Sequence, residues 1–146
     1  MKRPFALTLI FGALVWTAQA RLGENKDQIE DRYGKPTESL GRVSKAIEES
    51  NRYENESYSI RVDFLRDESG FEAYRKLDES PFTGAEIKRL LEANADESKW
   101  VKRGEETTHR DWWYRKDGGA TACYDHQQHS FTVKSSAYQK ALTSGK

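Results

Sequence analysis

The sequence predicts an α+β fold, in which an antiparallel sheet of four to six strands carries two short helices on one face. Three features predict it: two segments open with helix-capping signals, residues 58–64 alternate apolar and polar side chains, and the last third alternates strand-like runs with turns. The order helix, hairpin, helix, meander is also typical of two degenerate αββ repeats, although two unrelated αββ segments can look equally alike.

The first helix is expected at residues 26–33. Asn25 is a good N-cap, and Gln28, three residues later, can complete a capping box. Gly34 suits the left-handed position after a helix, and Pro36 prevents the helix from continuing.

The second helix begins with Thr83 and Glu86, which have the spacing of a second capping box. Its apolar stripe consists of Ile87, Leu90, Leu91 and Ala95, and its end is expected near residues 94–96.

The clearest strand is residues 58–64, and a turn at residues 66–70 leads to a return strand at 71–74. Residues 37–55 are charged and weakly patterned, which favours a loop or an irregular first strand. Further strands are expected at 100–101, 112–115, 120–125 and 131–133, and the chain closes with a short helix over 138–142.

The first 20 residues have the pattern of a cleavable secretory signal peptide. Lys2 and Arg3 precede an apolar run over residues 5–16, and Ala18-Gln19-Ala20 is a small-x-small cleavage site. An uncleaved membrane anchor is the alternative, but a spanning helix needs about 20 apolar residues. The pattern therefore predicts export, a single α+β domain over 21–142 and a disordered tail over 143–146.

Charge and cysteine content limit the functional classes. The chain has 24 basic and 24 acidic residues, so loss of Lys2 and Arg3 leaves a net charge of −2. Such a balance indicates neither a nucleic acid partner nor an anionic membrane partner. Cys123 is the single cysteine, which favours the bacterial periplasm or the extracellular space over a disulfide-rich eukaryotic secretory product. No cofactor is expected, and no membrane span after cleavage.

Residues 23–36 resemble the opening of the BamE/SmpA and β-lactamase-inhibitor-like group of small exported proteins. The resemblance rests on Gly23, Ile29, Gly34 and Pro36, while Asn25 stands where that group usually has a hydroxyl cap. It implies a helix followed by antiparallel strands, and a protein that binds other proteins instead of catalysing a reaction.

One cluster suggests an alternative, a small metal- or thiol-dependent hydrolase centred on Cys123, His126 and His129. Zinc requires cysteine or imidazole ligands that converge on one point. A strand separates Cys123 and His126 by roughly 10 Å and turns them to opposite faces. A buried cysteine beside a polar turn is the competing interpretation.

The aromatic run at 112–114 predicts the binding surface. Trp112 and Tyr114 share one face of a strand, and Trp113 lies on the other. Since Trp, Tyr and Arg dominate binding hot spots, Trp113 and Arg115 are the first candidates, with Tyr74 behind them. The alternative is that Trp113 covers the sheet against neighbours such as Tyr74. We expect a non-enzymatic exported module that binds a protein or a cell-envelope surface.

Overall fold

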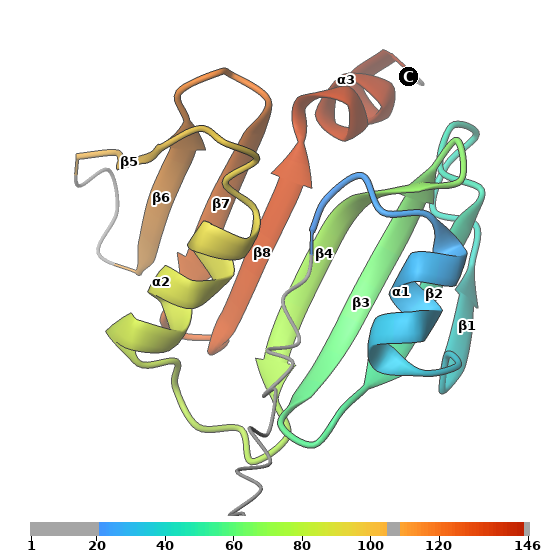
Figure 1. Cartoon of the computed structure of the whole chain (residues 1–146), viewed down its shortest axis with the longest axis horizontal. Helices are drawn as coiled ribbons and strands as arrows, with labels where there is room; N and C mark the ends of the chain where they lie inside the picture. The colour runs from blue at the N-terminus through green and yellow to red at the C-terminus, as the bar shows by residue number, and fades with distance from the viewer. Residues whose placement is uncertain (1–20, 105–108, 145–146) are drawn as a thin grey trace, which may run out of the picture.

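The computed structural model describes residues 21–104 and 109–144, which form one eight-stranded antiparallel sheet and three short helices (Figure 1). The strand order is β1-β2-β3-β4-β8-β7-β6-β5. The predicted signal peptide and residues 145–146 lie outside the described residues, while Thr143 and Ser144 of the predicted tail belong to the last helix.

Each half of the chain contributes one helix followed by four strands. The N-terminal half comprises α1 (Lys26–Tyr33), β1 (Glu38–Gly41), β2 (Glu49–Glu54), β3 (Tyr58–Leu65) and β4 (Glu68–Lys76). The C-terminal half comprises α2 (Gly84–Ala93), β5 (Trp100–Lys102), β6 (Arg110–Arg115), β7 (Ala120–Asp125), β8 (Ser130–Ser135) and the closing helix α3 (Ser136–Ser144). Pairing of β4 with β8 joins the halves at the centre of the sheet.

The predicted fold class was wrong in its extent. Among the described residues the sheet has eight strands instead of four to six, the closing helix packs on the face opposite the other two, and four strands instead of two follow α1 and α2. The missing strands are β1 and β2, in the segment expected to be a loop or an irregular first strand. In β2 the polar side chains of Ser50 and Asn51 are buried on opposite faces, Asn51 on the same face as Tyr53, so the apolar alternation that marks a strand is absent there.

The helix starts were confirmed in detail. In α1 the Gln28 amide donates to the Asn25 side chain over 3.0 Å, and in α2 the Glu86 amide donates to the Thr83 hydroxyl over 3.2 Å. Both capping boxes are complete because the Gln28 and Glu86 side chains accept from the cap backbone. None of the described helices has the length and apolar character needed to span a membrane.

Both α1 and α2 lie on one face of the sheet, which we call the inner face (Figure 1). Ile29 and Tyr33 of α1 and Leu90 and Leu91 of α2 belong to a continuous core. The sheet contributes to this core Tyr53, Ile60, Val62, Tyr74, Ala122, Tyr124, Phe131 and Val133. The opposite face, which we call the outer face, receives α3.

Tyr138 anchors α3 to the outer face. Its ring stacks on Phe71 at a centroid separation of 5.5 Å, and its hydroxyl donates to buried Asp63 over 2.5 Å. Gly70 makes this approach possible, since a Cβ there would lie 2.9 Å from the Tyr138 ring. α3 therefore covers the outer face over β3 and β4.

Candidate functional site

Trp113 lies on the inner face, where it is half-buried. Its ring centroid is 6.4 Å from that of Phe131, and the Lys102 ammonium lies 5.7 Å from the centre of its ring. Its neighbours across the sheet are Lys102 and Ala122. The aromatic body of Trp113 thus borders the core, and Lys102 covers part of it.

Arg115 and Tyr74 also lie on the inner face. Arg115 is 9% exposed, and its guanidinium is held by Asp117 at 2.8 Å and by the Asn94 carbonyl at 3.2 Å. Tyr74 is 1% exposed and packs against Phe131 at 6.3 Å. Phe131 thus links Tyr74 to Trp113, and a binding role for the three predicted residues stays a prediction.

The three residues of the alternative hydrolase site have separate partners. His126 Nε2 is 2.9 Å from an Asp111 oxygen, and His129 Nδ1 is 2.9 Å from the Glu79 carbonyl. Burial raises the pKa of the Cys123 thiol to about 11, and Asp125 adds to this effect, so the thiolate nucleophile is disfavoured at neutral pH. Across residues 21–104 and 109–144, no group of three or more His, Cys, Asp or Glu side chains is arranged to hold a metal ion.

The outer face over β6, β7 and β8 carries a surface that the sequence did not single out. It combines two aromatic side chains, small and hydroxyl side chains, and one cation, and we call it the outer patch: Trp112, Tyr114, Thr121, Cys123, Thr132 and Lys134. The register joins them in two rows, Tyr114–Thr121–Lys134 and Trp112–Cys123–Thr132. Among the described helices only α3 comes near these strands, where it follows β8, and it then turns toward β3 and β4 (Figure 1).

Exposure and charge distinguish the outer patch from the inner face. Tyr114 is 43% exposed, one of the few large hydrophobic side chains at the surface. Lys134 forms no ion pair with another described residue, whereas Arg110 beside the patch is held by Asp125 at 2.8 Å. Period-two alternation could show that Trp112 and Tyr114 share a face, but not which face the helices cover.

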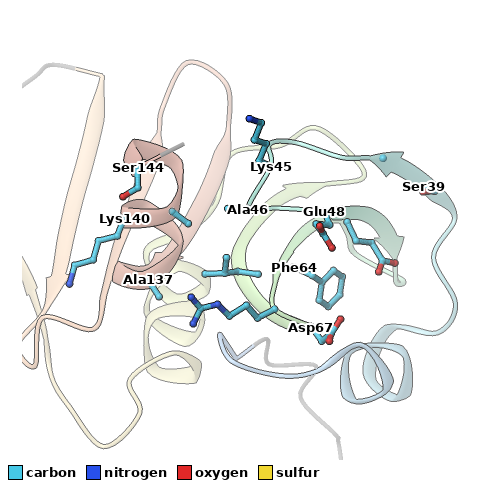
Figure 2. Close-up of a pocket in the computed structure, with 14 residues that line it drawn as sticks. Ser39, Lys45, Ala46, Glu48, Phe64, Asp67, Ala137, Lys140 and Ser144 are labelled. Atoms are coloured by element: carbon cyan, nitrogen blue, oxygen red, sulfur yellow. The ribbon is translucent and has the colours of Figure 1, made fainter. Parts of the chain in front are cut away.

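A hollow lies between α3, the β1–β2 connection and the β3–β4 turn. It encloses about 1040 Å³, with Phe64, Leu65, Ala137 and Ala141 among its lining residues. Figure 2 shows Phe64 in the middle of the lining, with the Lys45 and Lys140 side chains directed away from it. Charged side chains also line this hollow, namely Lys45, Glu48, Glu49, Arg66, Asp67 and Lys140, so its lining is mixed polar and apolar.

Comparison with known proteins gives no family for this chain. No family model matches it, and no curated protein matches it significantly. Among solved structures, it is similar to an extracellular protein containing an SCP domain from Bacillus anthracis str. Ames, with 9% identity and a TM-score of 0.46. That match covers 86% of this chain and 47% of the other chain. The resemblance of residues 23–36 to the BamE/SmpA and β-lactamase-inhibitor-like group stays a prediction.

Proposed function

We propose that the protein is an exported, non-enzymatic binding module that receives a protein partner on its outer patch. The observation that carries the proposal is an aromatic pair on the part of the outer face that α3 leaves open, with Tyr114 43% exposed. Trp and Tyr provide large contact areas at a small entropic cost and are enriched at binding hot spots. The predicted leader supports export to the bacterial periplasm or the extracellular space.

The patch favours a partner segment that carries both an apolar and an acidic side chain. Thr121 lies between Tyr114 and Lys134 in one cross-strand row, so a partner segment that crosses the row can contact Tyr114 with an apolar side chain and Lys134 with an acidic one. Lys134 is half-buried and has no ion-pair partner among the described residues, so a carboxylate beside it would gain a charge-assisted contact. Charge complementarity of this kind selects partners and speeds their encounter.

The proposal can be tested with a displayed library of random peptides selected against the purified exported protein. We expect the enriched peptides to combine Asp or Glu with an apolar residue. A synthetic copy of one such peptide should shift backbone amide signals of β6, β7 and β8 in nuclear magnetic resonance spectra.

Variants inside and outside the outer patch test whether the selected peptide binds there. Tyr114→Ala and Lys134→Glu should each weaken binding of the selected peptide by about tenfold or more, because each removes a direct contact. Leu77→Ala and Lys88→Glu make the same kinds of change at exposed side chains outside the patch and should leave the affinity unchanged. Equal affinity for all four variants, or shifts confined to the inner face, would overturn the proposal.

A further inference from the structure

A buried acidic residue lies on the inner face near α1, to which Tyr74 and Tyr33 connect it, and it serves no role in the proposed binding surface. Glu72 of β4 is 0% exposed and points to the inner face, between Val62 of β3 and Val133 of β8. One carboxylate oxygen accepts from the Tyr74 hydroxyl, and the other has no hydrogen-bond partner in the described structure. A buried carboxylate with an unpaired oxygen is costly, so its presence needs a reason.

α1 and the residues before it form the cover over Glu72. The hydroxyl of Tyr33 in α1 lies 3.4 Å from the Tyr74 hydroxyl. Arg32 of α1 pairs with Glu24, and their side chains are 22% and 13% exposed. Arg32 Nε and Glu24 Oε2 are buried and lack partners among the described residues. Polar atoms without partners thus gather where α1 meets the sheet.

The groups around Glu72 make its ionisation unfavourable. Burial raises the pKa of Glu72 to about 7, and the Glu24 carboxylate adds to this increase, whereas the hydrogen bond from Tyr74 and the charge of Arg32 lower it. The strands on either side offer only Val62 and Val133 on this face, so no further charge balances the carboxylate. An ionised Glu72 gains hydration only if the cover opens.

We propose that α1 and Glu72 form a pH-sensitive latch, in which α1 stays docked while Glu72 is protonated and opens more often once Glu72 is ionised. The residues before α1 remain attached, because Gly23 N donates to the Ser69 carbonyl and Leu22 N to the Asn94 side chain, over 2.8 and 2.9 Å. Opening therefore pivots α1 away from the sheet and uncovers Tyr74, which the sequence had marked as a binding residue.

The linkage between protonation of Glu72 and docking of α1 gives the direction in which docking changes with pH. Docking of α1 is strongest below pH 4.5, where Glu72 is protonated whether the helix is docked or open. Docking weakens as pH rises from 4.5 to about 7, since only the open form ionises in this range, and it levels off above about 7. The latch is therefore closed in acid and loosened at neutral pH.

Native-state hydrogen exchange of the purified protein, followed by nuclear magnetic resonance from pH 5 to pH 8, tests the latch. After correction for intrinsic exchange rates, protection of the α1 amides should fall by about a hundredfold. Protection in α2, which covers no buried acid, should change far less. Glu72→Gln should abolish the pH dependence in α1 and keep its amides protected at pH 8.

A second variant keeps the test decisive if Glu72→Gln does not fold. Glu24→Gln removes the neighbouring carboxylate, so the midpoint of the α1 transition should move to lower pH, and the carbon-13 shift of the Glu72 carboxyl should titrate with the same midpoint. Equal pH dependence in α1 and α2, or a midpoint that is the same with and without Glu24, would overturn the latch. Neither result would bear on the outer patch.

Discussion

The two halves of the sheet have similar element orders but different interiors. In the C-terminal half, α2 packs with Leu90 and Leu91 in an apolar core with Tyr124. In the N-terminal half, Tyr33 of α1 contacts the Tyr74 hydroxyl, which donates to buried Glu72. One arrangement of helix and strands thus supports two kinds of helix–sheet contact, one insensitive to pH and the other dependent on the protonation of a single carboxyl.

The outer face also differs between the halves, because α3 covers it in the N-terminal half only. Over β3 and β4 it is closed by α3, whose Tyr138 contacts Phe71 and Asp63, while Arg61 and Ser50 complete the hydrogen bonds of Asp63. Over β6 to β8 no described helix lies on it. The half with the apolar helix contact therefore carries the proposed binding surface, and the half with the polar helix contact carries the proposed latch.

The largest expected effect comes from the residue that joins the halves. Phe131 is 0% exposed, on the β8 strand that pairs with both β4 and β7, and it contacts Tyr74 and Trp113. Phe131→Ala should lower the free energy of unfolding by about 4 kcal/mol, because it removes a buried ring and leaves a cavity. Urea denaturation measures this change, with Leu77→Ala as the exposed control. A loss below about 1 kcal/mol would show that the halves are not joined through this ring.

Glu72→Gln should produce the next largest effect, with a size that depends on pH. The carboxyl ionises near 4.5 in the unfolded chain and at about 7 in the folded protein, so burial of Glu72 costs stability that grows between these values. The variant should raise the free energy of unfolding by about 3 kcal/mol at pH 8 and leave it nearly unchanged at pH 4. Denaturation curves at both pH values measure it, and an equal gain at both would contradict the assignment.

The smallest expected effect comes from removing the N-cap side chain of either helix. Asn25→Ala and Thr83→Ala each remove a capping side chain that accepts from a backbone amide, so each should cost about 1 kcal/mol. We expect faster hydrogen exchange in α1 alone for the first variant and in α2 alone for the second. If either variant loosened both helices equally, the halves would behave as one cooperative unit, and the comparison between them would not apply to dynamics.

Sequence patterns located most elements but undercounted the sheet. The alternation at 58–64 and the turns of the last third gave β3, β4 and the strands from β5 to β8 near their observed positions. β1 and β2 were missed because Ser50 and Asn51 are buried as polar residues, with Ser50 bonded to Asp63 over 2.5 Å. Such burial depends on a partner on another strand, which local patterns do not contain.

The site was harder to predict than the fold. Alternation correctly separated Trp113 from Trp112 and Tyr114, but the inner face was decided by where α1 and α2 pack. Trp113 and Arg115 thus lie on the covered side, and the exposed aromatic is Tyr114. Nothing local in the sequence marks Glu72 as buried, because acidic residues are mostly exposed.

By itself the amino-acid sequence determined where the two capped helices begin, since a cap is made by residues only three positions apart. It also determined which residues of each regular strand share a face, because side chains alternate along a strand. Only the tertiary structure decided how many strands join the sheet, which face is covered and which carboxyl is buried. These depend on contacts between residues far apart in the chain, such as Tyr138 with Asp63 and Tyr33 with Tyr74.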